Sequence, residues 1–413
     1  MRILISQSRF LLGGSETYSV TVAERLEQLG HPVEIFATEA SEKGRELVAS
    51  RGLTLTTGDP ATLVDRDDFD AVIAQDPASA YAIASRRELP QLFVIHGFAF
   101  FEHPPQALRP HPPVIVLNDR VGRHAAALAS KPEVVRLRQP IDLQRFKPRG
   151  PSRPRARRVL VFSNYLEPDR MAMLQQACDD LGLELTSMGA GANSSVVPED
   201  AIADADIVVG YGRSILEGMV MGKAAYVYDR AGGDGWVTPE SYPALESDGF
   251  SGGATDLLVD AERLRADFAA YRPELGTLGY DLVRAHHSAG PHTEALVELL
   301  ERTPVPAADP VQATLGTLVR AQVRAADDAA RLEYQLRVRG GEAERLRVKI
   351  AGLEPLEPAL AAANEHLEFE RKRRAELEAQ LQAAFDSISW RLTAPLRAFT
   401  RRLRWLRGRF SGR

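Results

Sequence analysis

The sequence predicts an α/β protein of two domains that face each other across a cleft, followed by an α-helical coiled-coil extension. Short apolar runs typical of strands alternate with helical segments over residues 1–302. Pro-rich stretches at 147–158 and 303–310 divide the chain, and a seven-residue apolar repeat follows the second. These observations give the expected limits: a first domain at 1–150, a second at 151–302, a linker at 303–310, a coiled coil at 311–385 and a basic tail at 386–413.

The first domain should open with a strand, a glycine turn and a helix. Ile3 to Ser6 has a strand-like apolar pattern, Gly13 and Gly14 follow, and a helix is expected from about Ser15 to Leu29. A second strand is expected at 33–37, and others at 71–74, 91–95 and 114–117. This alternation is typical of a parallel sheet covered by helices.

The second domain repeats the pattern. Strands are expected at 159–163, 184–187 and 207–209, with a helix near 171–181. A long helical stretch from about 280 to 302 should close the domain.

Composition limits the classes of function. The 413 residues carry a formal net charge of -5, which is not the basic field that nucleic-acid binding requires. The single cysteine, Cys178, cannot form an internal disulfide, and the apolar run at 1–6 is too short for a signal peptide. No apolar stretch approaches the roughly 20 residues of a membrane-spanning helix. We therefore expect a cytoplasmic protein whose membrane contact is peripheral.

Two glycine-bearing loops precede helices and are candidate phosphate sites. At Gly13-Gly14, backbone N–H groups could approach a phosphate, although a tight turn is an equal alternative. In the second domain, Gly212, Arg213 and Ser214 follow the strand at 207–209, and Glu217 lies one turn into the next helix. A helix N-terminus with an arginine could hold a diphosphate, and the glutamate could accept hydrogen bonds from ribose hydroxyls.

These motifs resemble the retaining glycosyltransferases of group 1 (family four), which have the GT-B fold of two Rossmann-like domains. The segments that carry the resemblance span about residues 1 to 300: Gly13–Glu16, Asp70–Asp76, Ile95–Gly97, Gln139–Phe146, Leu216–Met219, Gly222–Lys223 and Asp229–Gly233. The resemblance implies that Gly14 lies near the donor phosphate and acceptor, and His96 near the donor sugar. It also implies that Arg213 and Ser214 lie near the diphosphate and Glu217 at the ribose, and that the anomeric configuration is retained.

The sequence departs from the family pattern in two places. Val209 stands where the family has a second glutamate that contacts the donor sugar, and the loop after it is short. A strand-end Gly-Arg of the family is also replaced, so that Arg170 is the candidate for a displaced phosphate-binding cation or else a surface arginine. Gly189 and Gly191 follow a strand and are expected to border the nucleotide.

Neither a metal nor a cofactor is expected. His286, His287 and His292 have no matching set of carboxylates, and no Asp-x-Asp pair follows a strand of the second domain. The nucleotide sugar would be a substrate.

The extension should bring copies of the chain together. Apolar residues alternate at steps of three and four from Val311 to Leu353 and resume as far as Phe385, which predicts a coiled coil and a homo-oligomer.

The tail at 387–413 contains eight arginines and no acid, with apolar residues along one helical stripe. This pattern predicts an amphipathic helix on the anionic inner face of the cell membrane. A helix packed on the coiled coil and an RNA-binding tail are the alternatives.

The sequence thus favours a glycosyltransferase that moves a sugar from a nucleotide-diphosphate donor to a cell-surface glycan precursor, in particular a lipid-linked one. Two alternatives remain: a nucleotide-sugar epimerase of the same fold, and a non-catalytic coiled-coil scaffold with a degenerate site.

Overall fold

The computed structural model describes residues 1–98, 103–189, 194–230, 232–255, 257–351 and 365–383. The chain separates into two units, Met1–Gly316 and Thr317–Arg413. Both β-sheets belong to the first unit, so the expected α/β architecture with two sheets is confirmed.

The first sheet has seven strands in the order β3-β2-β1-β4-β5-β6-β7, and all of its pairings are parallel. Its strands are β1 (Ile3–Phe10), β2 (Val33–Ala40), β3 (Thr54–Thr57), β4 (Ala71–Ala74), β5 (Gln91–Ile95), β6 (Val114–Val116) and β7 (Val134–Arg136). The central strands β4 and β5 are buried along their whole length, as a sheet covered on both faces requires. Their carboxyl ends meet at one edge, where polar residues begin.

The second sheet has five strands in the order β12-β11-β10-β8-β9. Its strands are β8 (Arg158–Ser163), β9 (Glu184–Gly189), β10 (Ile207–Gly210), β11 (Ala224–Asp229) and β12 (Gly232–Trp236). Only β12 among them is antiparallel to its neighbour. The sequence did not predict β12 because GGDGW offers three glycines in five residues and no apolar alternation.

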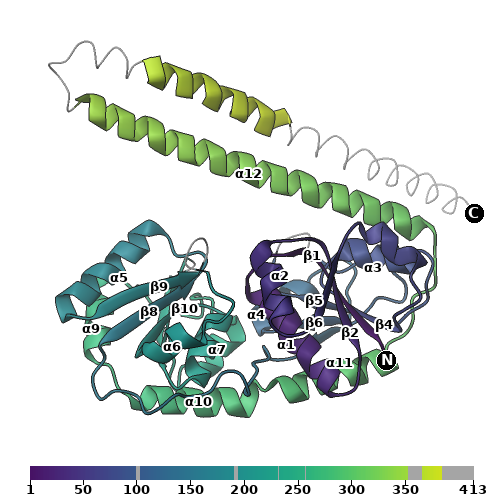
Figure 1. Ribbon diagram of the computed structural model, residues 1–413, viewed down its shortest axis with the longest axis horizontal. Coiled ribbons are helices and arrows are strands. Elements are labelled where there is room, and N and C mark those ends of the chain that lie inside the picture. The colour runs from purple at the N-terminus through teal and green to yellow at the C-terminus, as the bar shows by residue number, and fades with distance from the viewer. Residues whose placement is uncertain (99–102, 190–193, 231, 256, 352–364, 384–413) are drawn as a thin grey trace, which may run out of the picture. The chain divides into compact units, whose positions relative to one another are not determined.

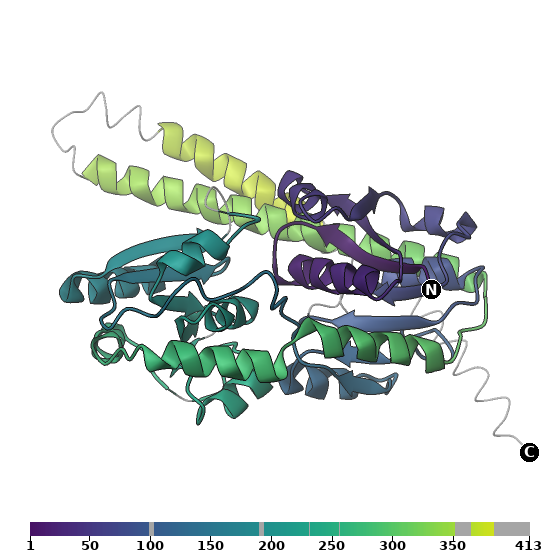
Figure 2. The same ribbon diagram turned by 60° about the horizontal axis from the view of Figure 1, so that its bottom comes forward.

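Helices cover both sheets (Figures 1 and 2). Those that follow strands of the first sheet are α1 (Gly14–Gln28), α2 (Glu42–Ala49), the 3-10 helix η1 (Pro60–Asp65), α3 (Pro77–Ala84) and α4 (Asp119–Ala126). Those of the second part are α5 (Pro168–Leu181), α6 (Glu199–Asp204), α7 (Arg213–Val220), α8 (Tyr242–Asp248), α9 (Ala261–Ala269) and α10 (Glu274–His286). One face of the second sheet packs with α5 and α9, and the other with α7 and α10.

The stretch expected as one helix from about 280 to 302 is two helices, α10 and α11 (Ala289–Arg302). They break at His287–Ser288, where Ile141 donates its N–H to the carbonyl of His287 and accepts from the N–H of Ala289. Helix α11 then packs in the core of the first sheet through Leu296, Leu299 and Leu300. The sequence assigned these residues to the second domain, but the chain returns to the first because only that core receives this apolar face.

Beyond α11, helix α12 (Val311–Ala351) runs without interruption, and residues 365–383 form a further helix. The start of α12 belongs to the first unit: a Cβ on Gly316 would lie 3.1 Å from the carbonyl oxygen of Ala78 in α3, so this close approach favours glycine. In the second unit, the 365–383 helix buries Leu367 and Leu377, and it runs beside α12 in both views (Figures 1 and 2).

The coiled-coil pairing and the oligomer stay predictions. The predicted membrane-binding tail lies outside the described residues, since 384–413 are not described. No helix in the described part of the chain is both long and apolar enough to cross a bilayer.

Candidate functional site

Arg213 joins the two α/β domains. Its Nε donates to Oε1 of Glu217 at 2.8 Å, its Nη1 to the carbonyl oxygen of Pro140 at 2.7 Å, and its Nη2 to Oγ1 of Thr21 at 2.9 Å. Thr21 lies in α1 of the first domain, whereas Arg213 and Glu217 lie one turn apart in α7 of the second. The guanidinium therefore connects α1, α7 and the segment after β7 that contains Pro140.

The Arg213–Glu217 pair is almost completely buried, with side-chain exposures of 7% and 5%. Burial lowers the pKa of Arg213 and raises the pKa of Glu217, while the charge of each partner opposes these shifts. Loss of one partner would leave a buried charge without compensation. The pair is thus a structural bridge, and the predicted contacts of Arg213 with a diphosphate and of Glu217 with a ribose stay predictions.

His96 directly follows β5 and belongs to a hydrogen-bonded chain of polar side chains. Its Nε2 lies 2.7 Å from Oε1 of Gln75, and Nε2 of Gln75 donates to Oγ of Ser19 at 2.6 Å. The Ser19 hydroxyl donates to Oε1 of Gln7, whose Nε2 donates to Oε1 of Glu16. Since an amide oxygen only accepts, Nε2 of His96 carries the proton and Nδ1 is left as an acceptor.

Tyr18 lies between two histidines. Its ring packs edge-on against His96 with 4.9 Å between centroids, and its hydroxyl lies 3.0 Å from Nε2 of His292. Burial, together with the positive charge of Arg213 and with His292, lowers the pKa of His96 to about 3. Burial likewise lowers the pKa of His292 to about 4. Both imidazoles are therefore neutral at physiological pH, and they lie in the field of Arg213.

The N-termini of α1 and α7 carry no side-chain cap. Gly13 precedes α1 and Gly212 precedes α7, and neither side of these turns supplies a capping hydrogen bond to the helix amides. Gly212 has φ +57°, which favours glycine, and a Cβ on Gly14 would meet nothing within 4 Å. Ser214 caps the loop itself, since its Oγ accepts from the N–H of Tyr211. The first-turn amides of both helices are therefore available to donate hydrogen bonds to an anionic ligand.

The carboxyl edge of the second sheet holds a further polar group. Asp229, at the end of β11, is 2% exposed, and its Oδ2 has no hydrogen-bond partner in the described part of the chain. Burial raises the pKa of this carboxyl, opposed by Ser163, Arg170 and Arg230. Arg170 lies over the ring of Tyr228 at 5.1 Å from its centroid. The candidate cation Arg170 thus stands beside this edge, next to the acid.

Gly189 lies at the same edge, where β9 ends beside β8. A Cβ there would collide with the carbonyl oxygen of Ser163, so glycine is required for the strands to meet. Gly191 lies outside the described residues, because 190–193 are not described.

Sequence reasoning missed an aromatic pair at this edge. Tyr165 follows β8 and Tyr211 follows β10, and their rings pack edge to face with 5.7 Å between centroids. Tyr165 is 52% exposed, so a large part of this aromatic side chain is accessible to solvent. No local motif marks either tyrosine, because only the sheet brings the ends of β8 and β10 together.

Val209 does not face this edge. Its side chain is fully buried in the core that β10 shares with α5 and α9. An acid at this position would enter that core, so the valine is a packing residue of this strand.

The predicted residues thus form two groups. Gly13, Gly14, His96, Arg213 and Glu217 lie around α1 and α7, whereas Arg170 and Gly189 lie at the carboxyl edge of the second sheet. Gly212 and Ser214 lie between these groups, since Tyr211 contacts Tyr165 at the sheet edge, Gly212 precedes α7 and Ser214 is the second residue of that helix. Among the residues that the structure describes, no group of three or more His, Cys, Asp or Glu could hold a metal ion.

Comparison with solved structures identifies the architecture. A glycosyltransferase from Rickettsia africae ESF-5 superposes with a TM-score of 0.51 at 13% identity, covering 73% of this chain and 98% of that one. Anabaena Alr3699/HepE, in complex with UDP and glucose, also gives 0.51, at 15% identity and with 73% and 99% covered. The chain has the GT-B fold. At such low identity the likeness extends to the fold alone. No protein-family model and no curated protein matches the sequence.

Proposed function

We propose that this GT-B chain is a glycosyltransferase that uses a nucleotide-diphosphate sugar as donor. One observation carries the proposal: the uncapped N-terminus of α7, which begins with the buried Arg213, stands at the carboxyl edge of the second sheet, where Oδ2 of Asp229 has no hydrogen-bond partner among the described residues. In open α/β sheets ligands bind outside the carboxyl ends of the strands, and helix N-termini favour phosphates. Among the structural neighbours, the Rickettsia africae protein is a glycosyltransferase and Anabaena Alr3699/HepE binds UDP and glucose, which supports the same class.

In the proposed reaction, the bond between the anomeric carbon and the diphosphate oxygen breaks as a bond to an acceptor hydroxyl oxygen forms. The nucleoside diphosphate leaves with the bonding electron pair, and the hydroxyl proton goes to the released phosphate. The first-turn amides of α7 would stabilise the charge that develops on the diphosphate. His96, which is neutral, could accept a hydrogen bond from a sugar hydroxyl through Nδ1. This scheme uses no metal, and we propose a metal-independent reaction.

The finer assignments rest on the sequence. We propose retention of configuration, from the resemblance of Gly13–Glu16 and Leu216–Met219 to the family, and a cell-surface, lipid-linked glycan precursor as acceptor, from the basic tail. In this proposal the protein works at the inner face of the cell membrane and forms a homo-oligomer through α12.

A direct test compares nucleotide binding by the natural chain and the Glu217→Gln variant, which preserves volume and removes one charge. UDP and GDP should raise the melting temperature of the natural chain by mass action. Loss of a charge-assisted hydrogen bond to ribose should weaken binding in the variant about tenfold. Glu298→Gln, on the exposed face of α11, is the matched control and should bind as the natural chain does.

Transfer assays separate the alternatives. Release of nucleoside diphosphate that depends on an acceptor glycolipid supports the proposal. Conversion of the free sugar nucleotide to an epimer without acceptor would favour an epimerase. Absence of nucleotide binding at millimolar UDP and GDP would favour the non-catalytic scaffold over an enzyme.

A further inference from the structure

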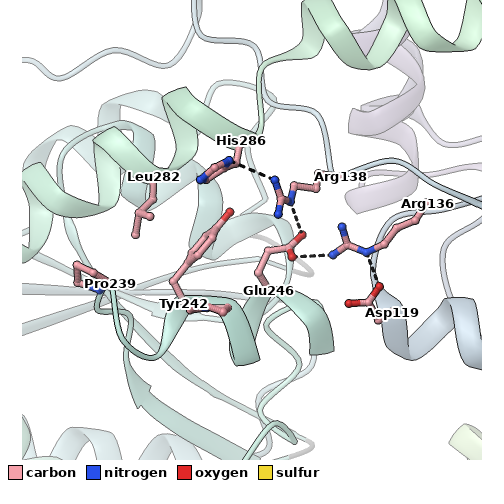
Figure 3. A pocket seen from close by; sticks show the side chains of 9 residues that line it. Asp119, Arg136, Arg138, Pro239, Tyr242, Glu246, Leu282 and His286 are labelled. Carbon is pink, nitrogen blue, oxygen red and sulfur yellow. Dashed lines mark hydrogen bonds and ion pairs between the residues drawn. The ribbon is translucent and has the colours of Figure 1, made fainter.

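A pocket of about 450 Å³ lies where the two α/β domains meet, and its described lining includes none of the residues that the sequence predicted for the donor (Figure 3). Its polar side is formed by Asp119 of α4, Arg136 of β7 and Arg138 from the first domain, with Glu246 of α8 and His286 of α10 from the second. Volumes of roughly 300–1,000 Å³ are typical of small-molecule sites, which often lie at domain interfaces.

The polar side is a compensated ionic cluster. Oε2 of Glu246 accepts from Nη2 of Arg136 at 2.6 Å, and its Oε1 lies 3.5 Å from Nε of Arg138. Arg136 also lies 2.6 Å from Oδ1 of Asp119 through its Nε. Two arginines therefore face two carboxylates, and the formal charge of the cluster is zero.

This balance of charges determines which ligand charge the pocket can accommodate. The Glu246 side chain is only 6% exposed, so an anion that drew the arginines away would leave a buried carboxylate without a partner. A cation would compete with the same arginines for the carboxylates. A neutral ligand leaves the cluster intact.

The cluster still presents hydrogen-bonding groups to the pocket. Nη1 of Arg138 lies 3.2 Å from Nδ1 of His286, and since arginine only donates, Nδ1 accepts and Nε2 of His286 carries the proton. In the described part of the chain, no protein group bonds to that Nε2, to Oδ2 of Asp119 or to Nη2 of Arg138. The pocket thus offers donors and an acceptor close together, as a hydroxyl-rich ligand requires.

The opposite side of the pocket is apolar. Pro239, Tyr242 and Leu282 line it, and Figure 3 shows them across from the ionic cluster. The Tyr242 ring is stacked with that of His286, with 5.8 Å between centroids and 23° between planes. Sugar rings combine a C–H face with a rim of hydroxyls, so an apolar wall with aromatic rings beside a charge-balanced set of donors and acceptors matches them.

We propose that this pocket binds a neutral saccharide and is the subsite for the acceptor sugar; the acceptor role rests on the proposed transferase function. The α8 side of the pocket is connected to the donor loop by a backbone hydrogen bond. Helix α8 ends at Asp248, and two residues later the carbonyl oxygen of Phe250 accepts from the N–H of Gly212 at 2.9 Å. The Gly212 loop begins α7, so a saccharide in the pocket would be adjacent to the proposed diphosphate site.

The test measures saccharide binding to the full chain, with and without UDP, by saturation-transfer NMR and calorimetry. The probes are methyl glucoside and methyl N-acetylglucosaminide as neutral pyranosides, and methyl glucuronide as the anionic counterpart. Variants His286→Ala and Asp119→Asn each remove one proposed contact at a partly exposed side chain. Their matched controls are Arg284→Gln on α10 and Arg123→Gln on α4, both on exposed positions outside the pocket.

A neutral pyranoside should bind with a millimolar Kd, and each pocket variant should weaken it about tenfold while the controls change it less than about twofold. Nucleotide binding and the melting temperature should stay unchanged in the variants. Absence of saccharide binding up to about 20 mM, equal effects of variants and controls, or binding of the glucuronide alone would overturn the proposal. Saccharide binding that depends on His286, in a chain that neither binds nucleotide nor transfers sugar, would support the pocket and overturn the transferase function.

Discussion

The buried Arg213–Glu217 pair provides the sharpest test of how the domains are held together. We expect Arg213→Met to lower the free energy of unfolding by about 3–5 kcal/mol, since it leaves the Glu217 carboxylate buried without its partner. The same change removes hydrogen bonds to Pro140 and Thr21. Urea unfolding followed by circular dichroism measures the loss. Thr21→Val, which removes the hydroxyl that accepts from Arg213 and donates to the carbonyl of Thr17, should cost less, about 1–2 kcal/mol.

A second variant separates charge burial from lost packing. In Arg213→Met/Glu217→Leu no charge is left without a partner, so at least half of the stability lost by the single variant should return. A single variant that loses less than about 1 kcal/mol, or a double variant no more stable than the single one, would refute the reasoning.

The pH dependence supplies an independent check. Burial already raises the pKa of Glu217 above its ordinary 4.5, and Arg213 opposes that rise, so the Arg213→Met change should raise the pKa further. A group with a raised folded-state pKa contributes stability below its unfolded pKa and loses it as the pH rises through the folded value. The stability gap between the natural chain and Arg213→Met should therefore narrow on going from pH 8 to 5, by up to about 1.4 kcal/mol per pH unit. A gap that is independent of pH would contradict the assignment.

Three further outcomes are expected. Burial lowers the pKa of His96 and His287 to about 3 and of His292 to about 4, so the stability from these neutral rings is present above about pH 6.5 and lost as the pH falls toward 3. His292→Gln should therefore reduce the fall of the melting temperature between pH 6 and 4. An unchanged dependence of the melting temperature on pH would argue against this. Deletion of 387–413 should abolish most flotation with anionic liposomes while UDP binding persists. Flotation of the full chain should weaken but not vanish as salt rises, because burial of the apolar side chains of the tail depends little on salt. Equal flotation of the full and shortened chains would discard the anchor. Light scattering should find a dimer or higher oligomer at micromolar concentration, and a monomer would contradict the predicted coiled-coil contact.

The local sequence pattern was enough to predict the elements whose signals lie within a few neighbouring residues. Apolar runs located β4 and β5 with the bounds that the structure has, and the Gly13-Gly14 turn located the start of α1, because strand burial and helix starts are decided within a few residues. The strand β12 and the antiparallel edge were missed, since glycine-rich GGDGW has no apolar periodicity and is placed by pairing with β11. Helix α11 was assigned to the wrong part of the chain for the same reason, because its partner is a core built mainly from residues between Ile3 and Leu117, far earlier in the chain.

For the candidate site, the sequence alone identified the residue types, including His96, Arg213, Ser214 and Glu217 beside their glycine loops. It could not tell that Arg213 would be held by Thr21 and Pro140, that Val209 would face a core, or that Tyr165 and Tyr211 would meet at the sheet edge. Such contacts join residues far apart in the chain, and hydrogen-bond partners become fixed only when packing brings them within about 3 Å. The sequence thus determined which functional side chains the protein has. The tertiary structure decided which of them hold the two domains together and which remain accessible to a ligand.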